Sequence, residues 1–277
     1  MAARTDLTAL ALTRNSWPTQ EIDGLTLIRS PLLLAVPSLV HAFTTRLGGN
    51  SAPPLDSFNL GRHWGTQESR KDALHNRQRL CAALEMNFNR LVVPGQVHST
   101  NVAWVTEPEH LGSVDGVATV SPDTPVMLHY ADCVPIVIAE PNLPALAVVH
   151  AGWRGTAGGI AGKAVRLLSE ALAIDPDVLL AAVGPAIGSC CYPTGIDVAE
   201  QLLSSVQHKA GLVRWHDDRP YPDLKAINAM QLLEAGLERI DVASWCTACH
   251  PDLFYSHRRF AGKTGRQSAI ASIVARP

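Results

Sequence analysis

Two histidines and one cysteine follow or interrupt apolar runs and carry the side-chain types that bind a transition metal. His98 follows the run 91–97 in P-G-Q-V-H-S, Cys133 lies between two apolar runs in Y-A-D-C-V-P, and His150 ends the run 146–150. The ends of strands present reactive groups to a cleft from a rigid scaffold. Two imidazoles and one thiolate leave the fourth position of a tetrahedral zinc ion open, which is the layout of a catalytic site. The long spacing carries little specificity, so core histidines and a buried thiol are the alternative.

The same side chains fit a second chemistry that needs no metal. Cys133 could act as a nucleophile, with His150 or His98 as its base. Asp132 adjoins the cysteine, but neighbours along a strand point to opposite faces, so Asp132 need not orient the same imidazole. The sequence therefore leaves both a metal site and a cysteine nucleophile open.

A glycine-rich segment after the third of these residues is a candidate anion site. Residues 150–162 contain five glycines together with Arg154. A glycine-rich turn that opens a helix exposes backbone N–H groups to an anion, and Arg154 could add paired contacts to a phosphate. No G-K-[ST] follows, so this is not a Walker loop, and the glycines could equally serve only close packing of helix and sheet. Arg46 in T-T-R-L-G-G and Asn59 in S-F-N-L-G flank a long polar loop and are weaker candidates.

The other cysteines and a basic run carry weaker signals. Cys190 and Cys191 in G-S-C-C-Y-P predict a tight turn. The run 246–250 reads C-T-A-C-H, the pattern of c-type haem attachment, but we expect no export signal to accompany it. A structural zinc pair lacks an evident second C-x-x-C, so we interpret these as core thiols at a strand end. The basic run 256–266 is interpreted as a solvated loop, a basic wall beside the cleft, or an intersubunit contact.

The composition excludes several classes of protein. The chain has 277 residues, of which 47% are apolar and 17% charged, with a formal net charge of −2. A nucleic-acid-binding domain carries a basic stripe, so we expect no nucleic-acid partner. A membrane helix needs about 20 uninterrupted apolar residues, which we do not find. Six cysteines without a signal peptide do not predict a disulfide scaffold. We therefore expect a cytoplasmic protein, a monomer or homodimer, that acts on a small molecule.

The elements that must position these residues alternate between short β-branched runs and longer amphipathic stretches. This mixture predicts a mixed sheet covered by helices. We expect a loosely held extension over residues 1–24 and a single catalytic domain over 25–277. The expected strands or short apolar segments are Leu32–Val36, Val40–Phe43, Leu91–Val97, Val102–Val105, Gly116–Val120, Val126–Tyr130, Val134–Ala139, Leu146–His150, Val178–Val183, Ile240–Trp245 and Ser268–Val274. The expected helices are Glu68–Leu84, Gly158–Ala173, Ile196–Val206 and Leu224–Leu237.

Taken together, these motifs resemble the YfiH-type purine nucleoside phosphorylase family, also described as laccase-like multicopper polyphenol oxidases. The resemblance runs from about Phe43 to Ile273, and its most specific part is A-D-C-V-P-I followed by H-A-G-W-R-G. One departure is His257, where members usually have Tyr before the two arginines. The second Cys and the His of C-T-A-C-H also look peculiar to this chain. The other segments that carry the resemblance are F-T-T-R-L-G-G, F-N-L-G, G-Q-V-H, D-G-V-A-T, G-P-A-I-G-S-C-C-Y, D-L-K-A-I-N and S-H-R-R-F-A-G-K-T-G-R.

The resemblance implies an α+β fold with mixed sheets in an α/β/β/α arrangement. It places the family's zinc ligands, which are also the catalytic residues, on His98, Cys133 and His150. The implied activity is phosphorolysis of adenosine, inosine and 5′-methylthioadenosine to free base and ribose 1-phosphate, accompanied by adenosine deamination. Arg46, Asn59 and Arg154 are then candidates for binding substrate or phosphate.

Three other functions stay open beside that activity. One is a cysteine-dependent hydrolase or amidase acting on peptidoglycan precursors. Another is a copper-dependent polyphenol oxidase, since a set of two histidines and a cysteine can also hold copper. The third is a non-catalytic binding role.

Overall fold

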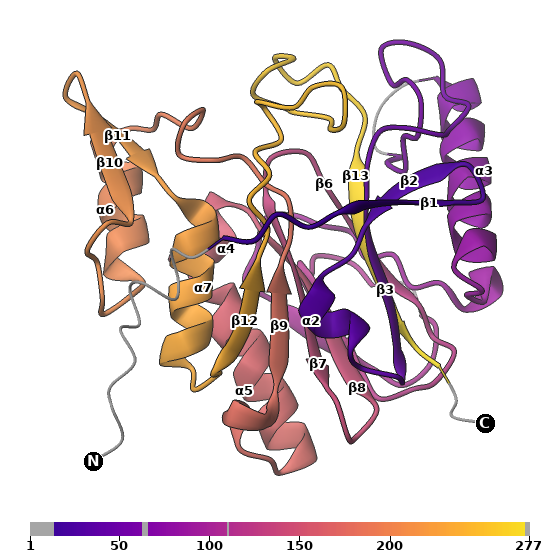
Figure 1. The fold of residues 1–277 in the computed structure, drawn as a ribbon, viewed down its shortest axis with the longest axis horizontal. Coiled ribbons are helices and arrows are strands. Elements are labelled where there is room, and N and C mark those ends of the chain that lie inside the picture. Colours follow the sequence, from indigo (N-terminus) through magenta and orange to yellow (C-terminus); the bar gives the residue numbers. More distant parts are fainter. Residues whose placement is uncertain (1–13, 63–65, 110, 275–277) are drawn as a thin grey trace.

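Two β-sheets lie face to face between two layers of helix, in a computed structural model that describes residues 14–62, 66–109 and 111–274. In Figure 1 the layers run across the view, from α5 and α7 on one side, through the two sheets, to α3 on the other. Each helix layer packs its own apolar cluster against the outer face of one sheet, and a third cluster fills the space between the sheets. The predicted α+β class and the α/β/β/α layering are confirmed.

The six-stranded sheet carries the strands that matter most for the site. Its strand order is β12-β9-β7-β8-β5-β4, and it mixes parallel and antiparallel pairs. The bounds of its strands are β4 (Val102–Val105), β5 (Gly116–Thr119), β7 (Val134–Glu140), β8 (Ala145–Ala151), β9 (Leu180–Val183) and β12 (Arg239–Val242).

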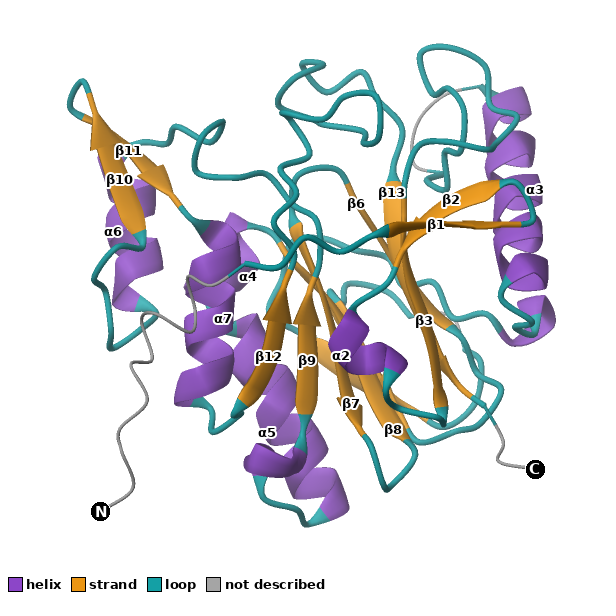
Figure 2. Ribbon diagram, in the orientation of Figure 1, coloured by secondary structure: helices purple, strands orange, loops and turns teal. Residues whose placement is uncertain are grey.

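The five-stranded sheet is antiparallel throughout and has the order β1-β2-β3-β13-β6. A separate hairpin, β10 with β11, projects beside α6 (Figure 2). The bounds of these strands are β1 (Thr19–Ile22), β2 (Leu25–Ile28), β3 (Leu39–Thr44), β6 (Val126–Tyr130), β10 (Val213–His216), β11 (Arg219–Pro222) and β13 (Gln267–Ile273). The helices are α2 (Pro31–Leu34), α3 (Gln67–Ala83), α4 (Trp153–Ala157), α5 (Ile160–Leu172), α6 (Ile196–Ser204), α7 (Leu224–Glu234) and the 3₁₀ turns Phe88–Arg90 and Pro176–Val178.

Both faces of the central strands are apolar because both are covered. Successive side chains of a strand point to opposite faces. In β8, Val149 packs on the helix side with Ile160 of α5, whereas its neighbour Val148 packs between the sheets with Phe43 of β3. A continuous run of Val, Ile and Ala is therefore what a doubly covered strand requires.

Most expected elements are present, and two are wrong. Val102–Val105 and Val126–Tyr130 are strands with the predicted bounds. Leu32–Val36 is not a strand: Ser30 caps the short helix α2, and Pro31 occupies the first turn, where its missing N–H costs nothing. Leu91–Val97 forms only a single bridge at Val92, because Pro94 and Gly95 interrupt the run.

The N-terminal segment is attached to the domain as far as the structure describes it. Residues 1–13 of the expected extension lie outside the described residues. From there on the segment is held firmly: Asn15 exchanges backbone hydrogen bonds with Val242 and Ser244, and β1 pairs with β2. Trp17 is fully buried and donates its indole N–H to Asp241 at 2.9 Å. The expectation of a loosely held extension is therefore wrong for residues 14–24, because a buried tryptophan and two strand pairings fix them.

None of the helices that the structure describes is both long enough and apolar enough to cross a bilayer.

Candidate functional site

Strand pairing brings three residues from distant parts of the sequence to one edge of the six-stranded sheet. β7 and β8 pair antiparallel with Pro135 opposite His150, so Cys133, just before β7, lies beside the end of β8. On the other side of β8, the His150 backbone N–H donates to the carbonyl of Asp115, just before β5, at 2.7 Å. Cys133, His150 and Asp115 therefore meet because β7, β8 and β5 are consecutive strands of the sheet.

His98 reaches the same point from the loop that leads into β4. Its Nε2 lies 3.9 Å from the Sγ of Cys133, and its ring centroid lies 5.0 Å from that of His150, at an interplanar angle of 74°. One ligand atom from each of the three side chains lies within 4.8 Å of the others. His98 has a left-handed backbone, with φ of 61°, a strained conformation that is concentrated at functional sites. The structure therefore brings the three predicted residues together.

Asp115 holds this arrangement and is a residue that sequence reasoning missed. Its fully buried carboxylate accepts hydrogen bonds from the backbone N–H groups of Val97, His98 and Ser99, at 3.2, 3.0 and 2.6 Å. It also accepts from the Ser99 hydroxyl at 2.8 Å and from Nδ1 of His150 at 2.9 Å. Burial alone would raise the pKa of Asp115, but the hydrogen bonds from His150 and Ser99 hold it well below its usual value. The ionised carboxylate fixes the His150 tautomer, so that Nε2 is left for a ligand.

Cys133 and His150 shift each other's protonation. Burial opposes ionisation of the thiol, but the charge of His150 and hydrogen bonds from both histidines lower the pKa of Cys133 to about 6. Burial also opposes the charge on His150, but the thiolate and the Asp115 carboxylate raise the pKa of that imidazole above its usual value. The pair therefore favours a thiolate, which is the form of cysteine that both binds metals and attacks electrophiles.

The residues present fit a metal ion. Two imidazoles and a thiolate form a donor set that zinc and copper both accept. Gly152 passes directly behind two of the ligands: a Cβ there would lie 2.8 Å from Cδ2 of His98 and 3.1 Å from Sγ of Cys133. Glycine at this position therefore leaves the ligands the room they need.

The side chains of Arg46 and Asn59 form hydrogen bonds with other groups of the protein. The Arg46 guanidinium donates to the carbonyl of Asp56 at 2.7 and 3.0 Å, to the Asp56 carboxylate at 2.9 Å and to the carbonyl of Pro251 at 3.0 Å. It also lies over the ring of Tyr255, 5.0 Å from the centroid. The buried Asn59 amide closes a turn with the backbone of Gly61. Both side chains thus shape the loop 47–62, and their binding of phosphate stays a prediction.

Arg154 lies two residues after Gly152, the glycine that packs against His98 and Cys133. It belongs to α4, whose N-cap is Gly152 and whose first turn receives no side-chain cap. The guanidinium lies 4.3 Å from the centroid of the Trp153 ring, and the residue is exposed. Of the three predicted anion contacts, Arg154 is the one in a helix that begins beside the candidate metal ligands, and its binding of an anion stays a prediction.

The basic run near the C-terminus reaches the residue beside Cys133. Asp132, with φ of 86°, accepts the backbone N–H of Arg258 at 2.6 Å and the hydroxyl of Thr247 at 2.7 Å. The Arg258 guanidinium lies over the ring of Tyr192, 4.8 Å from its centroid. Burial of the Arg266 guanidinium lowers its pKa overall, although the nearby charges of Cys133 and Asp132 oppose this shift. The run is a mostly exposed loop, as one interpretation expected, and it also lies beside Asp132, as expected of a basic wall next to the cleft.

No spacing rule links Asp132 to Arg258 or Asp115 to His150, because each contact depends on how strands and loops distant in sequence are assembled. The only available signal for Asp115 was general: a metal-bound histidine almost always donates its second N–H to a carboxylate or carbonyl.

Comparison with known proteins finds a matching family and close structural relatives. The family described as multi-copper polyphenol oxidoreductase laccase matches residues 40–274. The purine nucleoside phosphorylase YlmD of Geobacillus stearothermophilus is 38% identical over 246 residues, which cover 83% of this chain and 89% of the relative. A purine nucleoside phosphorylase of Deinococcus radiodurans is 36% identical over 256 residues, 91% of this chain and 95% of the relative. The crystal structure of YlmD from Geobacillus stearothermophilus superimposes with a TM-score of 0.87 at 36% identity, covering 94% of this chain and 99% of that one.

Proposed function

The chain belongs to the multi-copper polyphenol oxidoreductase laccase family, and from this membership we propose that it is a metal-dependent purine nucleoside phosphorylase. In this reaction phosphate cleaves the bond between the purine and the sugar of a nucleoside. The products are a free base and a sugar 1-phosphate: ribose 1-phosphate from adenosine and inosine, and its 5-methylthio derivative from 5′-methylthioadenosine. The observation that carries the proposal is the convergence of His98, Cys133 and His150 on one point, with Asp115 holding His150 from behind. Adenosine, inosine and 5′-methylthioadenosine are the proposed substrates, and zinc is the proposed metal.

His98, Cys133 and His150 would hold the zinc ion. A zinc ion in a three-ligand site acts as a Lewis acid and lowers the pKa of coordinated water to about 7. The other contributions come from the protein's own side chains. Asp115 keeps the His150 ring in one orientation, and the Cys133 thiolate is favoured before any metal binds.

Phosphorolysis needs phosphate to be held against the ribose. The C1′–O bond to phosphate forms while the bond from C1′ to the purine nitrogen breaks, and the base leaves with the electron pair and takes up a proton. Arg154, Arg258 and Arg266 give this side of the site a positive character that suits a phosphate dianion. We propose that Arg154 contacts phosphate directly and that Arg46 and Asn59 act by fixing the loop 47–62.

Deamination of adenosine is proposed as an accompanying reaction. In it, water attacks C6 of the purine and ammonia leaves. The two reactions attack different atoms of adenosine, so they separate in product analysis: phosphorolysis gives adenine, and deamination gives inosine.

The decisive experiment is incubation of the purified protein with inosine and phosphate. We expect equal amounts of hypoxanthine and ribose 1-phosphate, lost after treatment with a chelator and restored by zinc. His98→Ala should abolish the products, whereas His75→Ala, at an exposed position of α3, should not change them. Absence of ribose 1-phosphate from the zinc-loaded protein would overturn the proposal.

A cysteine-dependent hydrolase is the second candidate, because Cys133, His150 and Asp115 also have the order of a nucleophile, a base and an orienting carboxylate. Such a hydrolase or amidase, with peptidoglycan precursors as the proposed substrates, should keep its activity after chelation. A metal-dependent phosphorylase should lose it.

Copper-dependent oxidation of phenols is the third candidate, favoured by the family's description. It predicts oxygen consumption with a phenol by the copper-loaded protein, and no dependence on phosphate.

A further inference from the structure

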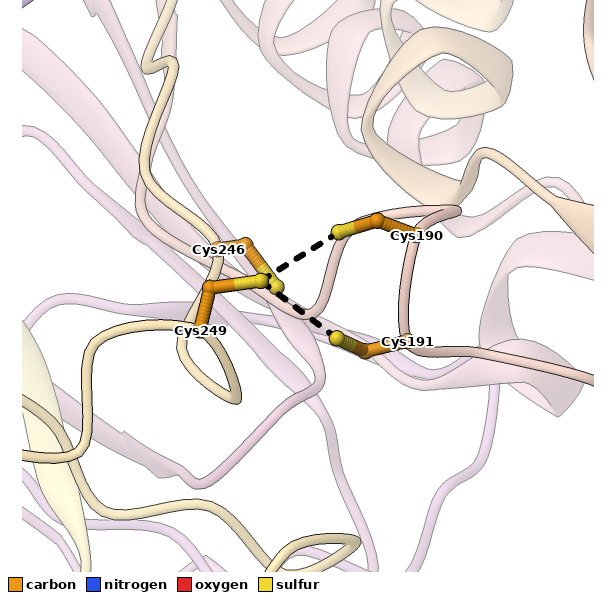
Figure 3. Close-up of side chains that lie close together, drawn as sticks. All are labelled: Cys190, Cys191, Cys246 and Cys249. Atoms are coloured by element: carbon orange, nitrogen blue, oxygen red, sulfur yellow. Dashed lines mark hydrogen bonds between the residues drawn. The ribbon is translucent and has the colours of Figure 1, made fainter.

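Four of the six cysteines meet at the end of the six-stranded sheet. Cys190 and Cys191 lie in the loop between β9 and α6, and Cys246 and Cys249 lie in the turn after β12. β9 and β12 are parallel neighbours, so the segments that leave them emerge at the same edge of the sheet. The pairing continues beyond the strands as a bridge between Ala186 and Cys246. Two cysteine pairs more than fifty residues apart in the sequence are thereby placed together (Figure 3).

The spacing of the four sulfur atoms matches a single tetrahedral ion. The Sγ of Cys249 lies 3.5 Å from that of Cys190 and 3.4 Å from that of Cys191, and all four sulfurs lie within 4.8 Å of one another. All four are free thiols. Zinc–sulfur bonds of about 2.3 Å in tetrahedral geometry place the sulfurs about 3.8 Å apart. The cluster therefore has the size of one ion and is too small for an iron–sulfur cluster with bridging sulfides.

The backbone at Gly188 contacts one thiol of the cluster and leaves room for another. Gly188 donates its N–H to the Sγ of Cys246 at 3.2 Å, the kind of outer contact that orients metal-binding thiolates. A Cβ at Gly188 would lie 3.1 Å from the Sγ of Cys190 and 3.3 Å from the Cβ of Cys246. Glycine at this position therefore lets the two loops approach closely enough for their thiols to share a ligand.

The interpretation of the C-T-A-C-H cysteines as core thiols is correct for Cys246, which is buried, and wrong for Cys249, which is exposed. Cys190, also exposed, does lie in the predicted turn. A second C-x-x-C was missing from the sequence, but the adjacent pair Cys190 and Cys191 takes its place in space.

We propose that Cys190, Cys191, Cys246 and Cys249 bind one zinc ion as a closed tetrathiolate site, separate from the site of His98, Cys133 and His150. Four protein ligands leave no open position, so the site is structural. It ties the loop after β9 to the turn after β12. Thr247, between two of the ligands, donates its hydroxyl to Asp132, the neighbour of Cys133. The tetrathiolate site therefore braces one wall of the candidate active site.

Metal stoichiometry separates the two sites. Full-length protein, kept reduced and loaded with Zn²⁺, should hold two zinc ions per chain by elemental analysis. The double variant His98→Ala/Cys133→Ala should hold one, with four sulfur neighbours at about 2.3 Å in zinc X-ray absorption. Cys190→Ser/Cys249→Ser should also hold one, now with nitrogen and sulfur neighbours. Cys81→Ser is the matched control, because Cys81 is buried in the α3 core away from both sites, and it should keep two.

Two results would overturn the proposal. One is a His98→Ala/Cys133→Ala variant that folds with reduced thiols and binds no zinc. The other is thiol counting on the freshly isolated protein that finds the four cysteines oxidised to disulfides. If Cys190→Ser/Cys249→Ser fails to fold, the His98→Ala/Cys133→Ala variant still decides, because it keeps all four thiols. None of these measurements uses phosphorolysis, so they are unaffected if the proposed activity is wrong.

Discussion

Asp115 and His150 are joined twice, once through the backbone and once through their side chains. The His150 N–H donates to the Asp115 carbonyl at 2.7 Å, and Nδ1 donates to Oδ1 at 2.9 Å. The first bond continues the β5–β8 pairing one residue beyond the pair of Gly116 and Val149, so the register of the sheet sets the geometry of the second. The same carboxylate also gathers the backbone of residues 97–99, which carries His98. The Asp115 carboxylate thus orients His150, one candidate ligand, and the loop that carries His98, another.

Replacement of Asp115 should weaken the three-ligand metal site. We expect Asp115→Asn to lower its zinc affinity by about 10–100-fold, because a neutral amide no longer fixes the His150 tautomer. Competition with a chelator measures the affinity, on the Cys190→Ser/Cys249→Ser background so that only this site is read. Asp123→Asn, at an exposed loop position, is the control. Equal affinities in the two variants would show that Asp115 does not support the metal site.

A methyl group at Gly152 should disturb the ligands without unfolding the protein. Its Cβ would press on His98 and Cys133, so we expect Gly152→Ala to lower zinc affinity and activity by about tenfold or more. Gly112→Ala is a matched control, because a Cβ there meets nothing within 4 Å. Zinc titration and urea unfolding of both variants make the comparison. Wild-type zinc binding by Gly152→Ala would contradict the tight packing described here.

Replacing Arg46 should mainly lower stability, whereas replacing Arg154 should mainly weaken phosphate binding. Arg46→Ala removes a charged donor from two carbonyls and a carboxylate, so we expect the free energy of unfolding to fall by about 2–3 kcal/mol. Arg154→Ala, at an exposed position, should change it by less than about 0.5 kcal/mol and raise the KM for phosphate about tenfold. Unfolding curves and phosphate-dependent kinetics test the pair. An unchanged phosphate KM in Arg154→Ala would remove this residue from the phosphate site.

His41 should make the fold sensitive to acid. Burial, helped by the charge of Arg29 and partly offset by Asp241, lowers the pKa of His41 to about 3 from its usual 6.5. Between pH 6.5 and about 3, His41 therefore takes up a proton in the unfolded chain but stays neutral in the folded one. The free energy of unfolding that depends on His41 is thus fully present above pH 6.5 and falls as the pH drops towards 3. The loss attributable to His41 should approach about 1.4 kcal/mol per pH unit within that window.

Urea unfolding between pH 7 and pH 4 tests this dependence. His41→Gln keeps an acceptor for the Ser30 N–H but does not titrate, so its stability should fall less steeply than that of the wild type. His75→Gln, at an exposed position, should follow the wild type. Parallel curves for wild type and His41→Gln would refute the prediction.

Much of the fold was predictable because the central strands are apolar on both faces. Runs such as Val126–Tyr130 are recognisable from β-branched residues bounded by turn residues. The short helix α2 was missed because its apolar residues resemble a strand, and only the cap at Ser30 and the position of Pro31 mark it as a helix. The hairpin of β10 and β11 was also missed, since its exposed residues lack an apolar run.

Cys133 and His150 were predictable as metal-binding residue types beside strands, whereas His98 was expected after a strand that the structure does not form. The family resemblance identified the three candidate ligands as a set. Asp115 was not predicted, because its role depends on the β5–β8 register rather than on any local pattern. The tetrathiolate cluster was not predicted for a similar reason. Nothing in the sequence says that β9 and β12 are parallel neighbours, so the two cysteine pairs could not be matched.

Residues 14–28 cross from one sheet to the other. Asn15 bonds the end of β12 in the six-stranded sheet, and a few residues later β1 pairs with β2 in the five-stranded sheet. Trp17 lies between these two attachments, buried in the core that separates the sheets. The segment therefore links the two sheets of the sandwich. A shortened chain that begins at residue 14 keeps these contacts, whereas one that begins at residue 25 loses the Asn15 hydrogen bonds, the buried Trp17 and strand β1.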